Sequence, residues 1–202
     1  MNPTPILTTL HLTVRPFMPA DAPAYLEMAR ANHGHLARFA PGNPARSVHT
    51  LADAEAVLGQ YAADWEAGTI FFFGAWRQVD GALLAQVALM PYNPDLPEDE
   101  VGCFVDGRYE GQGYATESLR AVVDYAFRGR GAKRVSCRCS DENVRSQRLI
   151  ARCGFTLEGI LRDCNPYVPR ANGSPSSEYV YGVLRREWEG AVMTTEHSRE
   201  ND

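Results

Sequence analysis

The sequence of 202 residues contains no apolar run of about 18 residues, which is the length that a membrane-spanning helix requires. Residues 1–10 also lack the basic stretch, followed by an apolar stretch, that marks a secretory signal. We therefore expect a cytoplasmic protein that is not associated with a membrane.

The five cysteines form no CxxC pair, and no histidine follows them at the spacing of a zinc finger. An odd number of cysteines without a secretory signal indicates reduced thiols. Cys137 and Cys139 would share one face of a strand, and we interpret them as small buried apolar residues. We expect no bound metal.

No strong positive charge is present either, because the net charge is −5. Proteins that bind nucleic acids usually carry a basic face, so we expect no DNA partner. A local basic cluster exists at residues 128–134, and we interpret it as a solvated helix end. An acidic surface suits a cationic acceptor such as an amine.

What the sequence does contain is an alternation of short strand and helix patterns. Strand patterns occupy residues 11–17, 70–76, 82–90, 100–105, 133–139, 155–162 and 177–184. Helix patterns occupy residues 20–31, 50–67, 113–130 and 143–153, and residues 33–44 are expected to form a loop. These patterns predict a mixed sheet with helices on both faces. We expect a single domain over residues 1–190 and a flexible tail over residues 191–202.

One loop has the composition of an anion site. Gly111 and Gly113 stand between a predicted strand and a predicted helix, whose first N–H groups lack partners. A pyrophosphate would suit such a helix start. The loop has neither the Lys-Ser/Thr ending of a nucleotide triphosphate loop nor the GxGxxG spacing of a dinucleotide site. An ordinary tight turn remains an alternative on this pattern alone.

The pattern Arg-x-x-Gly-x-Gly at residues 108–113, after a strand and opening a helix, resembles the GCN5-related N-acetyltransferases (GNAT). The segments around it resemble the branch that acetylates the N-termini of ribosomal proteins; they are residues 15–16, 100–102, 113–119, 143–146, 154–159 and 187–188. The resemblance covers residues 12–189. It implies the α/β (α+β) acyl-CoA acyltransferase fold, with a mixed, mostly antiparallel sheet of about seven strands and helices on both faces.

The resemblance also implies acetyl-CoA as the co-substrate and assigns residues to it. Its pyrophosphate would lie against the glycine loop, at Arg108, Gly111, Gln112, Gly113, Tyr114, Ala115 and Thr116. The strand residues Phe104 and Val105 would pair their backbone with the pantetheine arm, and Asn143 would contact that arm from the next helix. A plain helix N-cap is the alternative role of Asn143, and both roles are compatible.

Two residues are candidates for the proton transfers. A free amine is mostly charged at neutral pH, so a base must remove a proton before it attacks the thioester. Glu100 is the candidate base, directly or through water; its alternative is a surface carboxylate in an acidic run. Ser146 is the candidate donor to the thiolate or its hydrogen-bond partner, or else a small residue that leaves room for the cofactor. The tyrosine that many family members use is replaced by Ile150.

The resemblance leaves the acceptor open. A protein N-terminal α-amine of the ribosomal type is the main expectation, with a polyamine, an antibiotic or an aminoacyl compound as the alternative. The replacement at Ile150 also keeps open a non-catalytic module that binds acyl-CoA. Dimers are common in this branch, so a homodimer stays open, and the sequence does not set the oligomeric state. His33 and His35 are interpreted as loop histidines without a direct role.

Overall fold

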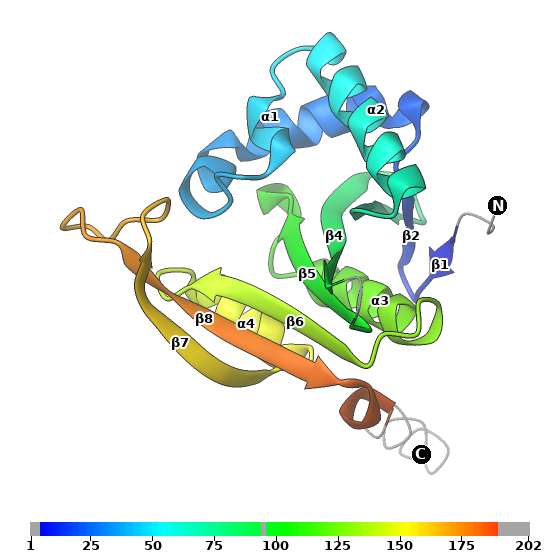
Figure 1. The fold of residues 1–202 in the computed structure, drawn as a ribbon. Helices are drawn as coiled ribbons and strands as arrows, with labels where there is room; N and C mark the ends of the chain where they lie inside the picture. Colours follow the sequence, from blue (N-terminus) through cyan, green and yellow to red (C-terminus); the bar gives the residue numbers. More distant parts are fainter. Residues whose placement is uncertain (1–4, 94–95, 190–202) are drawn as a thin grey trace.

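The computed structural model describes residues 5–93 and 96–189 and contains one eight-stranded sheet, in the order β1-β2-β3-β4-β5-β6-β8-β7 (Figure 1). The strands are β1 (Leu7–Thr8), β2 (Leu12–Pro16), β3 (Phe71–Arg77), β4 (Leu83–Asn93), β5 (Glu98–Val105), β6 (Arg134–Ser140), β7 (Thr156–Asn165) and β8 (Ser176–Leu184). The β5–β6 pair is parallel and the other pairs are antiparallel. The predicted mixed, mostly antiparallel sheet is confirmed, with eight strands against about seven expected. The predicted tail, residues 191–202, lies outside the described residues.

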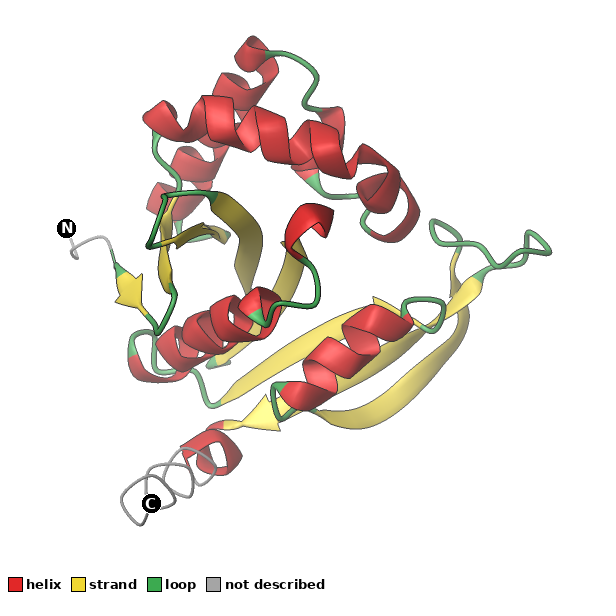
Figure 2. Cartoon of the chain, turned by 180° about the vertical axis from the view of Figure 1, so that it is seen from behind, coloured by secondary structure: helices red, strands yellow, loops and turns green. Residues whose placement is uncertain are grey.

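Helices cover both faces of the sheet, as expected. They are α1 (Ala22–Phe39), α2 (Leu51–Ala67), α3 (Tyr114–Arg128) and α4 (Val144–Arg152), with 3-10 turns at Pro19–Asp21, Pro44–Ser47 and Gly107–Tyr109. Helices α1 and α2 lie over one face, and α3 and α4 lie over the other, where Figure 2 shows them in front. No helix of the described ranges is both long and apolar enough to cross a bilayer.

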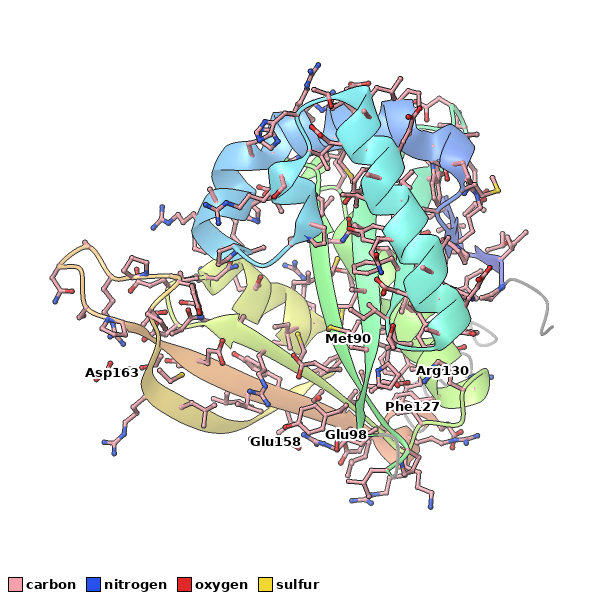
Figure 3. The ribbon with its side chains drawn as sticks, turned by 45° about the horizontal axis from the view of Figure 1, so that its top comes forward. Met90, Glu98, Phe127, Arg130, Glu158 and Asp163 are labelled. Carbon is pink, nitrogen blue, oxygen red and sulfur yellow. The ribbon has the colours of Figure 1, made fainter. Side chains whose placement is uncertain are left out.

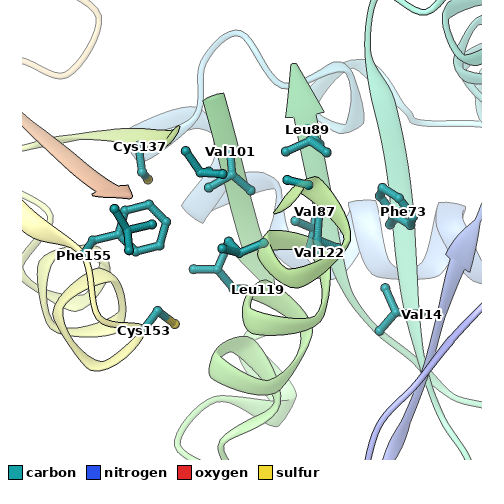
Figure 4. Close-up of a cluster of buried hydrophobic side chains, with 14 of the residues drawn as sticks. Val14, Phe73, Val87, Leu89, Val101, Leu119, Val122, Cys137, Cys153 and Phe155 are labelled. Atoms are coloured by element: carbon teal, nitrogen blue, oxygen red, sulfur yellow. The ribbon is translucent and has the colours of Figure 1, made fainter. Parts of the chain in front are cut away.

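The core beneath α3 follows from the spacing of its apolar residues. Leu119, Val122 and Ala126 are at most 1% exposed and lie on one side of the helix, toward Val87 and Val101 of the sheet. The cluster runs from β2 and β3 across to β6 and α4 (Figure 4). A second cluster fills the space between α1, α2 and the opposite face of the sheet. Strands β3 and β4 are therefore buried on both faces over most of their length, which explains the uninterrupted run Phe71-Phe72-Phe73.

The structure differs from the sequence expectation in two elements. Residues 33–39 were expected in a loop, but α1 continues through them to Phe39. Burial of Asn32 and Leu36 against the neighbouring elements outweighs the low helix propensity of Gly34. Strand β1 was not predicted because two residues are too short to show an alternation.

The sheet divides between β5 and β6. These strands pair only at Glu98↔Arg134, Asp99↔Val135 and Glu100↔Ser136. Arg134 Nε donates to Glu98 at 2.8 Å and its two NH groups donate to Glu158, which fixes the beginning of both strands. Figure 3 labels Glu98 and Glu158. Beyond Glu100 the two strands separate, and the edge of β5 that faces β6 lacks a strand partner within the described sheet. This separation is the feature that creates the site.

Candidate active site

The glycine loop connects the free end of β5 to α3. Gly111 (φ 77°) and Gly113 (φ 89°) adopt a left-handed backbone conformation that residues other than glycine rarely adopt. A Cβ atom added at either position would meet no protein atom within 4 Å, so both glycines face open space. Gly113 is the N-cap of α3 and provides no side chain to cap the helix. The first amides of α3 are therefore available to an anion, and the positive end of the helix dipole favours one.

A cavity of about 840 Å³ lies over this loop, within the range typical of ligand sites. Its walls come from the separated end of β5, the glycine loop, and the first turns of α3 and α4. Of the residues predicted for the site, those that line it are Phe104, Val105, Gly111, Gly113, Tyr114, Ala115, Thr116, Asn143 and Ser146. The structure thus gathers most of the predicted set around one space.

Arg108 does not line this cavity. Its guanidinium donates to Asp106, which is fully buried, at 2.6 Å, and to Glu27 of α1 at 2.5 Å. Burial alone would raise the pKa of Asp106, but the hydrogen bonds from Arg108 hold that pKa below its usual range. Arg108 therefore braces the loop against β5 and α1. Gln112 likewise does not line the cavity.

Helix α4 adds a cationic wall that the sequence analysis missed. Arg145, Arg148 and Arg152 line the cavity, and Arg145 pairs with Glu110 of the glycine loop at 2.6 Å. Arg148 and Arg152 are four residues apart, so they share one face of the helix. Guanidinium groups bind phosphates well, so this wall suits the phosphate-rich end of a nucleotide. The i, i+4 spacing of arginines after Asn143 was the available signal in the sequence.

A second cavity of about 360 Å³ lies on the other face of β5. Gly102 and Phe104 line it from β5, while Gln86, Ala88 and Met90 line it from β4. Side chains of a strand alternate between faces, so Cys103 and Val105 point toward the first cavity. Both cavities are lined by His35, Cys103, Phe104, Asn143 and Ser146. The two spaces therefore meet at the separated edge of β5.

Asn143 and Ser146 stand together at this junction. Asn143 is 9% exposed, and its side-chain oxygen accepts the backbone N–H of Ser146 at 3.1 Å, which caps α4. The N-cap role is thus observed, and the cofactor contact of Asn143 stays a prediction. Ile150 is 2% exposed and belongs to the core beneath α3 and α4.

Glu100 lines neither cavity. It lies on β5 two residues before Gly102, and its carboxylate is 3.6 Å from Nε of Arg138. Burial raises the pKa of Glu100 and Arg138 opposes that rise. The neighbouring carboxylates of Glu178 and Glu98 raise it further. Glu100 therefore stands beside the second cavity, next to Arg138, which does line it.

His35 borders both cavities because α1 continues past the residues expected in a loop. Burial lowers the pKa of its imidazole, Glu110 opposes the shift, and Arg145 adds to it. Its ring centroid lies 5.3 Å from that of Phe39. A neutral imidazole at this junction is able to accept a proton. Local sequence patterns do not predict this position, since it depends on how α1 packs over the sheet.

Cys103 also borders both cavities. Burial raises the pKa of its thiol to about 12, so it is protonated at neutral pH. A protonated thiol is a poor nucleophile. Among the described residues, no group of three or more His, Cys, Asp or Glu side chains is arranged to hold a metal ion.

Comparisons with known proteins agree with this geometry. Residues 11–156 match the family described as the acetyltransferase (GNAT) domain. The N-acetyltransferase YnaD of Bacillus subtilis is 25% identical over 182 residues, which span 90% of this chain and 98% of YnaD. These matches cover most of the chain.

Two solved structures share the fold. RimL, named as a ribosomal L7/L12 alpha-N-protein acetyltransferase and solved with coenzyme A, has a TM-score of 0.78, 18% identity, and coverage of 89% of this chain and 98% of its own. The microcin C7 self-immunity acetyltransferase MccE, solved with acetyl-CoA and AMP, has a TM-score of 0.74, 17% identity, and coverage of 87% and 93%. Such low identities bear on the fold alone. Since the family match spans well over half of the sequence, the chain belongs to the GNAT family and is an N-acetyltransferase that uses acetyl-CoA.

Proposed function

We propose that this enzyme acetylates a protein N-terminal α-amine of the ribosomal-protein type, by direct attack within a ternary complex. The observation that carries the proposal is the pair of cavities on opposite faces of β5 that share five lining residues: His35, Cys103, Phe104, Asn143 and Ser146. A donor in one cavity and an acceptor in the other would meet at these residues. No covalent enzyme intermediate is needed, which fits the protonated thiol of Cys103.

The first cavity has the parts that acetyl-CoA requires. The amides at Tyr114, Ala115 and Thr116 suit its pyrophosphate, and Arg148 and Arg152 suit its remaining phosphate. The unpaired edge of β5 at Phe104 and Val105 offers backbone groups to the amides of the pantetheine arm. Acetyl-CoA supplies the thioester carbonyl that the amine attacks.

The remaining chemistry is the removal and return of protons. Glu100, directly or through a water, takes the proton from the incoming ammonium, and its raised pKa brings it nearer to the working pH of a base. Ser146, at the junction of both cavities, is placed to donate a hydrogen bond to the departing sulfur. The buried thiol of Cys103 stays protonated throughout.

A small-molecule amine is the second candidate acceptor. The volume of about 360 Å³ favours it, because that size is at the lower end of the range of small-molecule sites. The terminal residue of a polypeptide also fits such a space, with the rest of the peptide outside. RimL, named as a ribosomal L7/L12 alpha-N-protein acetyltransferase, and MccE, named as a microcin C7 self-immunity acetyltransferase, share this fold, so the fold by itself does not select the acceptor.

The test is an acetyl-CoA thiol-release assay with a panel of N-terminal peptides of ribosomal proteins, polyamines, aminoglycosides and amino-acid amides. We expect release with peptides, and an acetylated α-amine identified by mass spectrometry of the product. Release with small amines only would contradict the ribosomal-type acceptor. Tight coenzyme A binding, measured by calorimetry, without release on any amine would instead support a non-catalytic acyl-CoA module, which the replacement at Ile150 left open.

A further inference from the structure

A buried carboxamide lies behind the second cavity. Gln86 of β4 is 2% exposed, and its side-chain oxygen accepts hydrogen bonds from the hydroxyls of Tyr25 (3.1 Å) and Tyr61 (3.4 Å). The two hydroxyls are 2.7 Å apart, and both tyrosines are buried between α1, α2 and the sheet. These contacts fix the orientation of the carboxamide.

The NH2 group of Gln86 occupies the side of the carboxamide that the two hydroxyls leave free, and Gln86 lines the cavity. No described residue accepts a hydrogen bond from Nε2 of Gln86, although Gln86 lines the cavity wall. Among buried side-chain nitrogens and oxygens of the described ranges, only Oγ of Ser136 is both enclosed and without a partner, so Nε2 is not enclosed by protein. A donor that protein atoms neither accept from nor enclose forms its hydrogen bond with water or with a ligand. Gln86 is therefore a preformed donor at the wall of the acceptor cavity.

This donor lies close to the place where the cavities meet. Gln86 is directly opposite Phe104 in the β4–β5 ladder, and Phe104 lines both cavities. Neighbouring strands are about 4.8 Å apart. A group that accepts from Gln86 would therefore lie near an amine held at the junction of the two cavities.

The charges around the cavity indicate which chemical group of the acceptor would bind to Gln86. Its described lining includes Arg138 and His35 but no aspartate or glutamate. Glu100 stands beside the cavity and serves the attacking amine, so a second ammonium, as in a polyamine, would lack a carboxylate of its own to offset the loss of its hydration. A carbonyl oxygen next to the amine would instead accept from Gln86, while Phe39, Phe72 and Met90 offer apolar walls to a side chain.

We propose that Gln86 is a specificity-determining residue that donates to the carbonyl oxygen adjacent to the acceptor amine. The enzyme would then select α-amino carbonyl compounds over plain alkyl amines and polyamines. This inference rests on the proposed amine acetylation and names the chemistry that its acceptor site reads. A polypeptide N-terminus and an aminoacyl compound both present that chemistry.

The test compares alaninamide with isopropylamine, in which a methyl group replaces the carboxamide. Rates are expressed per concentration of free amine, because the two amines differ in pKa. We expect the wild-type enzyme to prefer alaninamide by at least about tenfold in kcat/KM, which corresponds to one hydrogen bond. Gln86→Met and Gln86→Glu should reduce that preference to within about twofold of unity.

Tyr61→Phe is the matched control, because it removes one hydroxyl behind Gln86 and leaves the NH2 group in the cavity. It should retain the preference for alaninamide. The ratio is measured within each protein, so a partly unfolded variant still reports it. No preference in the wild type, or an unchanged preference in both Gln86 variants, would overturn the proposal.

A second measurement separates this proposal from the proposed function. In the isotope-labelled complex with coenzyme A, the side-chain amide signal of Gln86 is assigned by its loss in Gln86→Glu. Alaninamide should shift that NMR signal and isopropylamine should not; no shift with alaninamide would overturn the role of Gln86 even if acetylation occurs. A shift without acetylation of any amine would support the role of Gln86 and remove the proposed function. A tripeptide and alaninamide, compared in the same assays, distinguish a polypeptide acceptor from a small aminoacyl acceptor.

Discussion

At the scale of single residues, two side chains compete for the role of base. His35 borders both cavities, whereas Glu100 lies beside only one of them and lines neither. Burial moves both pKa values toward one another, upward for Glu100 and downward for His35. Glu100 remains the proposed base because the acceptor cavity, next to which it lies, is where an ammonium would enter. Substitutions of Glu100 and of His35 should therefore have different effects on kcat, KM and the pH–rate profile.

Glu100→Gln should lower kcat by about a hundredfold with little change in coenzyme A affinity, since general bases contribute at least this factor. A base acts when it is deprotonated, so wild-type activity should fall as the pH falls through the pKa of Glu100. That pKa lies above the ordinary glutamate range because of burial, so the loss begins at a higher pH than for an exposed glutamate. The measurement is a pH–rate profile together with calorimetry of coenzyme A binding.

His35→Gln provides the comparison. We expect it to raise KM for the amine, because His35 lines the acceptor cavity, and to retain the acidic limb of the profile. Loss of that limb in His35→Gln, with full activity of Glu100→Gln across the pH range, would transfer the role of base to His35. Charged groups that influence His35 include Glu110 and Arg145, so both proteins should be measured at the same ionic strength.

At the scale of elements, the glycine loop owes its shape to a brace on one side and open space on the other. The brace is the contact of Arg108 with buried Asp106 and with Glu27. The open space lies beside Gly111 and Gly113, where an added Cβ would meet no protein atom. The two sides predict different consequences for substitutions.

Gly111→Val should abolish coenzyme A binding while the fold persists, because the side chain would project into the space that a pyrophosphate needs. The residue also has a positive φ of 77°, which adds strain of about 1–2 kcal/mol. Gly81→Val is the matched control, since Gly81 has φ 71° and equally open surroundings in the β3–β4 turn. Both variants should lose similar stability, and only Gly111→Val should lose binding in calorimetry. Wild-type affinity in Gly111→Val would place the pyrophosphate elsewhere.

Arg108→Ala should lower the free energy of unfolding by about 2 kcal/mol at neutral pH, because the buried carboxylate of Asp106 loses charged hydrogen bonds. The folded-state pKa of Asp106 is depressed, so this stability is present above its unfolded pKa and is lost as the pH falls through the folded value. The difference between the two proteins in urea unfolding should therefore shrink in acid. A constant difference across pH would contradict the ionic origin of the brace. Arg77→Ala is a control, because its partner Asp80 is exposed.

At the scale of the whole molecule, the main feature is the separation of β5 from β6, which divides the sheet into two halves. The halves of the sheet are joined by three residue pairs and by the contacts of Arg134 and Arg130 with Glu98 and Asp99. A cofactor that bonds to the free edge of β5 would add hydrogen bonds where the sheet lacks them. Without coenzyme A, the amides along the free edge of β5 should therefore exchange with solvent faster than they do in the complex.

Hydrogen exchange measures this directly. Coenzyme A should slow the exchange of amides in residues 103–105 and at the start of α3, because these groups would gain acceptors. Amides of β8, which already pair on both sides, should change little. Equal protection of both regions would indicate general stabilisation by ligand binding instead of a bond along β5.

The sequence predicted the elements and the glycine loop because both depend on local patterns. Alternation and helical spacing located most strands and helices, and Gly111 and Gly113 marked the turn into α3. The positions of His35 and Gln86 depend on contacts between segments far apart in the chain, so no local pattern revealed them. The strand order, with β8 between β6 and β7, is also set by long-range pairing.

The meeting of two cavities at one strand edge has a consequence for inhibitor design. A conjugate that links an amino-carbonyl fragment to the sulfur of coenzyme A would occupy both spaces at once, with its linker passing Phe104 and Ser146. One molecule would then lose its translational freedom once while making both sets of contacts, so its affinity should exceed that of either fragment by orders of magnitude. If the fragment is varied while the coenzyme A part stays constant, the conjugate that binds most tightly should indicate which acceptor the enzyme prefers.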